Sequence, residues 1–193
     1  MSSTPFLLER LGALVHQSLR EDAARHGLLP IHIQVLEYLS QANRYSDIPI
    51  AVSEYFGITR GTVSQTLALL ERNGLLIKEP DARHGKRVHL RLTAAGRAIL
   101  RDSWTRRLEA AFPSFESVDR NALDAALCKL LTTLQRQNNQ RAFGICRQCT
   151  HFLSEARGSR CGLTGEPLAK DQTVRICREW TAPAPTGSAL QVT

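Results

Sequence analysis

Four cysteines close together near the end of the chain are the residues best suited to chemistry. Their spacing is Cys146-x2-Cys149-x11-Cys161-x15-Cys177. The stretch around them is rich in turn-forming residues and poor in apolar side chains, and a segment that small needs a cross-link or a bound metal to fold. Permanent disulfides are disfavoured in a cytoplasmic protein. The four thiols therefore predict metal ligation, with free or redox-active thiols as the alternative.

The spacing of the cysteines also bears on the identity of the metal. Structural zinc sites usually combine two Cys-x-x-Cys pairs, whereas this segment has one such pair and two isolated cysteines. Iron–sulfur clusters accept four thiolates at more varied spacing. The pattern therefore favours a [4Fe–4S] cluster, with Zn²⁺ as the alternative. The predicted ligands of either group are Cys146, Cys149, Cys161 and Cys177.

The positive charge of the chain is concentrated in one region. The 193 residues carry a net charge of +7. Residues 60–109 hold 11 Lys and Arg against 5 Asp and Glu, whereas residues 1–59 hold 4 against 6. Neutralising phosphates requires such a concentration, and solubility alone would not produce it. The charge therefore predicts a polyanionic partner for residues 60–109.

The stretch from Ile50 to Thr93 predicts the element that would contact this partner. Gly57 marks a sharp turn between two short helices, and Thr59 can cap the second helix. Two β-rich runs follow, at residues 75–79 and 88–93, with a basic loop between them. We interpret the stretch as a helix-turn-helix with a basic wing. The alternative is an ordinary two-helix corner with a surface hairpin.

Four more helices are expected around this element. The first runs from Phe6 to about Arg25, with an apolar stripe that faces either the core or a second subunit. The second begins at Pro30. A third extends from the Thr93 cap to about Phe112, and a fourth ends near Asn139 after starting at Ser117 or Asp119.

Two finer expectations accompany these helices. The tripeptide Ile48–Pro49–Ile50 is expected to form a short edge strand before the helix-turn-helix. Cys128 falls within the last helix, far in sequence from the other thiols. We expect it to be a buried structural cysteine, with a reactive sensor thiol as the alternative.

The order of elements resembles the MarR family of transcription regulators (multiple-antibiotic-resistance regulators). The similarity runs from about residue 6 to residue 139, and its most specific parts are EYFGITRGTVSQTLALLERNGLL, DARHGKR and LRLTAAGRAIL. It implies a winged-helix homodimer that binds a palindromic double-stranded DNA operator and usually represses transcription. By position, it implies two groups of DNA-binding residues: Thr59, Arg60, Gly61, Thr62, Ser64 and Gln65 in the major groove, and Arg83, Lys86 and Arg87 at the minor groove or its phosphates.

The cysteine segment resembles a second kind of protein. In certain small modules, C-x2-C-x2-F, a lone Cys-Gly and a final Cys-x-x-aromatic enclose a [4Fe–4S] cluster. The matching positions here are Cys146, Cys149, Phe152, Cys161-Gly162 and Cys177 followed by Trp180. The resemblance covers about 35 residues and implies that these four cysteines hold a cluster.

Together these features predict a fold class and a domain order. The class is mainly α: a winged helix-turn-helix with long dimerisation helices plus a small Cys-rich C-terminal metal-binding module. Residues 1–142 would form the DNA-binding and dimerisation domain, and residues 143–182 the module, docked beside the dimerisation helices. Residues 183–193 have a disordered composition.

The predicted function is a DNA-binding transcription regulator, most simply a repressor, whose [4Fe–4S] cluster acts as a redox or iron sensor. One alternative is a MarR-type regulator with a structural zinc site and a small-molecule effector. The other is a redox or electron-transfer protein, which is disfavoured because the sequence has no nucleotide-binding glycine loop and no paired catalytic acid and base. We therefore predict no enzymatic activity. The absence of a signal peptide and of a long apolar run predicts a cytoplasmic protein with no membrane association.

Overall fold

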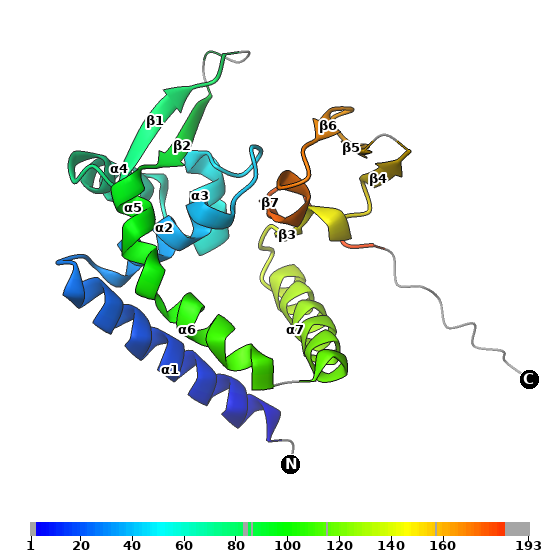
Figure 1. Ribbon diagram of the computed structural model, residues 1–193, viewed down its shortest axis with the longest axis horizontal. Helices are drawn as coiled ribbons and strands as arrows, with labels where there is room; N and C mark the ends of the chain where they lie inside the picture. The colour runs from blue at the N-terminus through cyan, green and yellow to red at the C-terminus, as the bar shows by residue number, and fades with distance from the viewer. Residues whose placement is uncertain (1–2, 83–84, 86, 115, 157, 184–193) are drawn as a thin grey trace, which may run out of the picture.

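The computed structural model describes residues 3–183, apart from residues 83, 84, 86, 115 and 157. Its N-terminal part holds the expected helices and hairpin (Figure 1). In chain order these are α1 Thr4–Arg25, α2 Pro30–Gln41, α3 Pro49–Phe56, α4 Arg60–Arg72, β1 Leu76–Pro80, β2 Val88–Leu92, α5 Ala94–Ile99, the 3-10 turn Leu100–Asp102, α6 Trp104–Ala111, the 3-10 turn Phe112–Ser114 and α7 Ser117–Gln137. Among the described residues, no helix is long and apolar enough to cross a bilayer.

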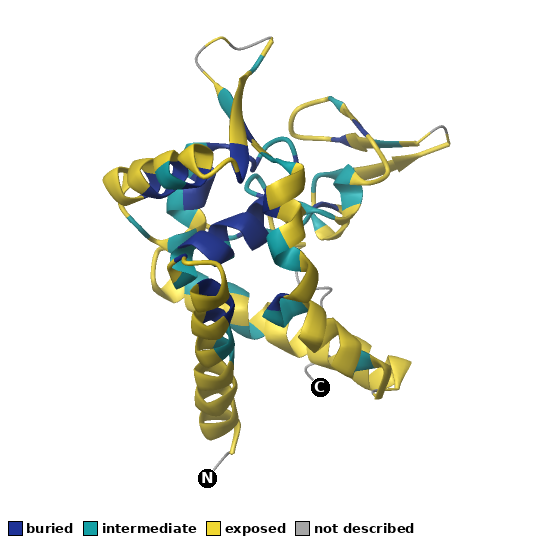
Figure 2. Cartoon of the chain, turned by 60° about the vertical axis from the view of Figure 1, so that its left-hand side comes forward, coloured by how far each residue is buried: buried dark blue, intermediate teal, exposed yellow. Residues whose placement is uncertain are grey.

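Residues 26–93, which we call the reading head, are built around α2. Ile33, Val35, Leu36 and Leu39 of this helix are buried, as predicted. Pro30 occupies the first turn, where a missing N–H costs nothing and a fixed φ suits the helix. Helices α3 and α4 and the β1–β2 hairpin pack around α2, and the segments coloured as buried in Figure 2 concentrate there.

The helix-turn-helix is confirmed, with one correction at its start. Gly57 adopts a left-handed φ of 63°, and Thr59 caps α4 by accepting the N–H of Thr62 at 3.1 Å. The predicted edge strand at residues 48–50 is wrong, because α3 already begins at Pro49. The carbonyl of Ile48 accepts the first helical N–H groups, and proline is favoured at the first helical position.

The wing is an antiparallel hairpin that pairs Leu76 with Leu92 and Pro80 with Val88. Its base is fixed by Asp47, from the α2–α3 loop. The Asp47 carbonyl accepts the Leu90 N–H at 2.7 Å, and its carboxylate contacts His89 Nδ1 at 2.5 Å and Arg91 at 2.6 Å. The wing is therefore attached to the loop that precedes the helix-turn-helix.

The long helix predicted after Thr93 is wrong in one respect, because it breaks at Ser103. Thr93 does cap α5, accepting the Gly96 N–H at 3.0 Å. At the break, however, Asp22 of α1 accepts the Trp104 N–H at 2.7 Å, and the Trp104 indole donates to Glu37 of α2 at 2.9 Å. These two carboxylates stabilise the new helix start, whose N-cap residue, Ser103, makes no side-chain capping hydrogen bond.

The apolar stripes of α1 and α7 are largely uncovered. Phe6, Leu11 and Leu131 are 66%, 57% and 52% exposed, and Figure 2 shows α1 projecting from the body of the chain with most of its length exposed. The expectation of a buried Cys128 is wrong, since this thiol is exposed on α7. Within the described part of the single chain, the face of α7 that carries it is left open to solvent.

The cysteine-rich segment, residues 144–182, forms a separate small unit that we call the thiol module. Its elements are β3 Gly144–Ile145, the 3-10 turn Cys146–Gln148, β4 Phe152–Glu155, β5 Gly158–Cys161, β6 Pro167–Leu168, the 3-10 turn Gln172–Val174 and β7 Ile176–Cys177. Strand β3 pairs with β7, and β4, β5 and β6 form a second antiparallel sheet.

The thiol module docks on the reading head at the α2–α3 loop and α3 (Figure 1). Ala42 forms a β-bridge with Ile176, and the Asn43 N–H donates to the Ile176 carbonyl at 2.9 Å. The predicted place of the module, beside the dimerisation helices, therefore needs correction. The module contacts the element that leads into the helix-turn-helix.

Candidate nucleic-acid interface and metal centre

The first candidate site is the outer face of α4 with its N-terminal cap. All six residues predicted for the major groove are exposed there, whereas Val63, Leu67 and Leu70 on the opposite face are buried. The helix therefore presents a small polar surface and is held from behind by aliphatic packing. The exposed residues are Thr59, Arg60, Gly61, Thr62, Ser64 and Gln65.

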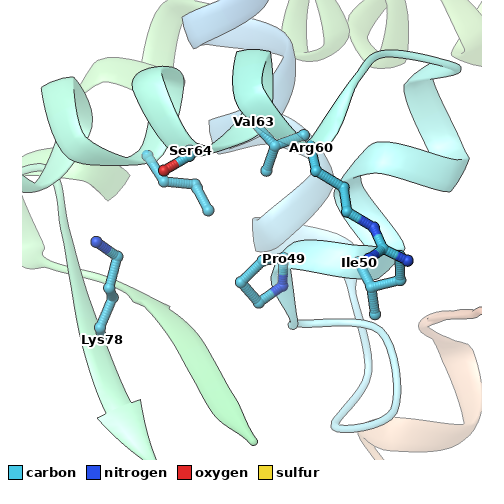
Figure 3. Close-up of a pocket in the computed structure, with 7 residues that line it drawn as sticks. Pro49, Ile50, Arg60, Val63, Ser64 and Lys78 are labelled. Atoms are coloured by element: carbon cyan, nitrogen blue, oxygen red, sulfur yellow. The ribbon is translucent and has the colours of Figure 1, made fainter.

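A cavity of about 400 Å³ lies between this face, the start of α3 and β1. Figure 3 shows Arg60 extending from the start of α4 toward α3, where Ile50 lies, and Lys78 pointing from β1 toward the side of α4 that carries Ser64. Lys78 also pairs with Glu71 at 2.6 Å. Lys78 was missed as a site residue, although its position on a strand of a basic hairpin is a usable signal.

The wing contributes one predicted residue within the described part of the chain. Arg87 is exposed just before β2. Arg83 and Lys86 lie outside the described residues, so their predicted contacts stay predictions. Among the basic residues that the structure does describe, Arg60 of α4 and Lys78 of β1 line the same cavity.

The second candidate site is the set of four cysteines, which the fold brings into one buried cluster. Cys146, Cys161 and Cys177 are buried with Trp180, and Cys149 packs against them. None is in a disulfide. Burial, and then the neighbouring Cys177 thiol, raise the pKa of Cys146 to about 12. Four thiols in such surroundings ionise together only if a cation compensates their charge.

Strand pairing explains how such distant cysteines meet. The β3–β7 pair sets Cys177 opposite Gly144, which lies two residues before Cys146 in the chain, and the β4–β5 pair sets Cys161 opposite Phe152. Gly144 has no alternative at its position, because a Cβ there would lie 2.5 Å from the Trp180 ring. The indole therefore lies flat against the backbone beside the thiols.

The thiols are surrounded by N–H groups. The backbone N–H groups of His151 and Thr181 donate to Cys149 Sγ at 3.5 and 3.3 Å. The Asn43 amide nitrogen and the Trp180 indole nitrogen are buried and have no partner among the described residues. Asn43 Nδ2 lies outside hydrogen-bond geometry but near enough to lower the pKa of Cys177, which burial raises overall. Buried orphan donors beside sulfur fit a group that adds acceptor atoms.

Within the described residues, no three His, Cys, Asp or Glu side chains are arranged to hold a metal ion. The four cysteines nevertheless belong to one packed cluster with Leu168 and Trp180. His151 is half-buried beside Phe152, and its backbone donates to Cys149. The structure thus brings the predicted ligands together without showing what they bind.

A smaller cavity of about 210 Å³ lies between α1, α2 and α6. Tyr38 and Trp104 line it, Glu37 is its buried carboxylate, and Ile176 reaches it from the thiol module. Burial raises the pKa of Glu37. The cavity therefore combines aromatic walls with a few polar groups, the usual composition of a small-molecule site.

Comparison with known proteins bears on the nature of the first site. Residues 26–87 match the sequence model described as MarR family. This segment, which holds α2, the helix-turn-helix and most of the wing, is therefore similar to that family. No curated protein matches the chain in sequence.

Solved structures show the same MarR-type fold. A point mutant of MepR from a multidrug-resistant Staphylococcus aureus clinical isolate is 18% identical, with a TM-score of 0.58 over 69% of this chain and 99% of that one. A MarR-family regulator from Silicibacter pomeroyi is 24% identical, with a TM-score of 0.55 over 67% and 88%. The S. aureus MepR–DNA complex is 18% identical, with a TM-score of 0.52 over 69% and 99%.

Proposed function

We propose that this MarR-type regulator binds a palindromic operator as a homodimer, and that a [4Fe–4S] cluster on Cys146, Cys149, Cys161 and Cys177 controls this binding. The observation that carries the proposal is the convergence of these four thiols in one buried cluster, within a module that contacts the reading head at the α2–α3 loop. A redox-active or labile group placed there can alter the head only if its two states differ in their contacts.

The donor set fits an iron–sulfur cluster. Four thiolates are its usual ligands, and N–H groups directed at sulfur are the means by which a protein tunes it. The backbone N–H donors to Cys149 supply such groups, and Trp180, whose indole N–H is unpaired among the described residues, is buried in the same cluster as the thiols. When bound, the cluster would supply reversible electron transfer and sensitivity to oxygen or iron supply.

The reading head supports the DNA-binding part. MepR, whose structure in complex with DNA shares this fold, binds DNA. In the present chain Arg60, Gln65 and Arg87 are exposed. We propose that Arg60 and Gln65 contact base edges and that Arg87 contacts phosphates. The uncovered stripes of α1 and α7 are suited to a second copy of the chain. A two-fold dimer would then set its recognition helices about 34–36 Å apart.

Anaerobic purification tests the proposal. We expect a brown protein with iron and sulfide close to four of each per chain. Cys146→Ser and Cys177→Ser should lose both, whereas Cys128→Ser should keep them, since its thiol is exposed on α7. Operator affinity, measured by fluorescence anisotropy, should change when the cluster is removed. A colourless protein with one zinc ion, or an unchanged affinity, would contradict the proposal.

A second candidate is a structural zinc site combined with a small-molecule effector. The cavity lined by Tyr38, Trp104 and Glu37 favours it, because an effector bound there would contact α1, α2 and α6 together. In that case air should leave operator binding unchanged. Enlarging the side chain at Gln34, which also lines the cavity, should block the effector.

A further inference from the structure

The dipeptide Cys177–Arg178 joins the thiol cluster directly to the reading head. Cys177 is buried among the thiols. The backbone N–H of Arg178 donates to Ser46 Oγ at 2.7 Å, and its guanidinium grips both carboxylate oxygens of Glu54 at 2.5 and 2.8 Å. A bidentate Arg–carboxylate pair is both strong and geometrically specific. One residue thus transmits the position of Cys177 to α3.

Glu54 lies between Arg178 and the recognition helix. The hydrogen bonds from Arg178 are the largest influence that lowers the pKa of Glu54, and the charges of Arg141 and Arg60 lower it further. Arg60 is the first residue of α4 and extends toward α3 (Figure 3). Since Arg178 occupies both carboxylate oxygens, and Arg141 Nη1 also pairs with Glu54 Oε2 at 3.5 Å, the attraction of Glu54 for Arg60 is limited.

The same dipeptide reaches the wing through the α2–α3 loop. Ser46 is fully buried, and its hydroxyl donates to Asn43 Oδ1 at 2.8 Å while accepting the Arg178 N–H. The next residue, Asp47, holds the base of the wing through Leu90 and Arg91. Both DNA-contacting elements therefore lie one or two contacts from Arg178.

We propose that Arg178 is the positioning residue that couples the thiol cluster to operator binding, and that loss of the cluster weakens this binding. The inference rests on the proposed function, because it needs the cysteines to hold a removable group. When the group is lost, Cys177 is released and Arg178 leaves Glu54. The freed carboxylate then competes with DNA for Arg60, and the α2–α3 loop loses its support.

The test compares Arg178→Gln with Arg160→Gln in the full-length protein. The Arg160→Gln control removes one positive charge from the same module. The described ion pair of Arg160 is with Glu155, which also lies inside the module. Iron and sulfide content are measured first. Anisotropy is then measured on a labelled duplex that the loaded wild-type protein has selected from a random pool, before and after removal of iron with oxidant and chelator.

We expect loaded wild type to bind this duplex about tenfold more tightly than cluster-free protein, within the roughly 5- to 150-fold range of typical couplings. Arg178→Gln should keep its iron and sulfide but bind weakly in both states. Arg160→Gln should behave as wild type. A full wild-type response in Arg178→Gln would overturn the inference. A wild type without any cluster-dependent affinity would instead overturn the proposed function.

Glu54→Gln provides a second variant outside the module. Removing the carboxylate removes the competitor for Arg60 but leaves the Arg178 N–H bond to Ser46 Oγ. When the cluster is removed, this variant should therefore lose less affinity than wild type, whereas Arg178→Gln binds weakly in both states. The comparison can be made even if Arg178→Gln fails to retain iron. A Glu54→Gln protein that loses as much affinity as wild type would overturn the inference.

Discussion

In the reading head, the centre of the fold is aliphatic: Leu36, Leu70 and Leu76 are fully buried at 0% exposure. In the thiol module, three of the five buried side chains are cysteines, joined by Leu168 and Trp180. The head can therefore gain its stability from burial of apolar surface. The module has little apolar surface to bury, and the proposed cluster would supply much of its stability. The proposal therefore predicts a head that is stable by itself and a module that is stable only when its thiols hold the cluster.

Removing the bound group should give the largest contrast between the two parts. Ligation of a structural metal can contribute on the order of 10 kcal/mol to folding. We expect a strong chelator to abolish hydrogen-exchange protection across residues 144–182 while α2 remains protected. Loss of protection in both regions would mean that the head is not independently stable. If hydrogen-exchange protection were retained in both regions, the module would be stable without a bound metal or cluster.

The second prediction removes an aliphatic side chain from each part. Leu36→Ala should lower the free energy of unfolding of the head by about 2–5 kcal/mol, because it leaves a cavity in a tightly packed core. Leu168→Ala, a buried counterpart in the module, should leave the urea midpoint of the head unchanged and reduce iron retention. If Leu168→Ala lowered the urea midpoint of the head as much as Leu36→Ala does, the two parts would not have separate cores.

A glycine beside the thiols offers a smaller perturbation. Gly144→Ala should destabilise the module by about 1–3 kcal/mol, since its Cβ would overlap the Trp180 ring. The fluorescence of Trp180, followed in a Trp104→Phe background, should shift. Gly12→Ala is the control, because nothing lies within 4 Å of its Cβ position on α1. An unshifted Trp180 spectrum would contradict the packing described above.

The finest distinction lies within the reading head, between base and phosphate contacts. Gln65→Ala should reduce discrimination between operator and random DNA by about 1–3 kcal/mol. Arg87→Ala should weaken both equally and lower the salt slope by about one. Both residues are exposed, so thermal stability should stay within about 0.5 kcal/mol of wild type. Altered stability in place of altered binding would count against these assignments.

Local chemistry made much of the reading head predictable. Gly57, Thr59 and Thr93 act where their backbone or capping preferences indicated, and the buried face of α2 follows from its periodicity. Pro49 misled the prediction, because proline suits a helix start as well as an edge strand. The break at Ser103 was not predictable, since it depends on Asp22, 82 residues away in sequence from Trp104.

The candidate sites divide in the same way. The exposed residues of α4 and the four cysteines carry their signal in residue type and spacing. Arg178, Glu54 and Asn43 carry none, because their roles arise from contacts more than 100 residues apart in sequence. The docking of the module on the α2–α3 loop could not be derived from either partner separately. Only adjacency to a predicted ligand, Cys177, could have drawn attention to Arg178.

Phe143 precedes the thiol module yet is buried in the core of the reading head. Its ring lies edge-on to Tyr55 at 5.2 Å and to Tyr38 at 6.4 Å between centroids. Cutting the chain before this residue would leave a hole among those aromatic rings. Transferring the module to another regulator would likewise require that Phe143 be transferred with it. The recipient would need aromatic residues in the positions of Tyr38 and Tyr55.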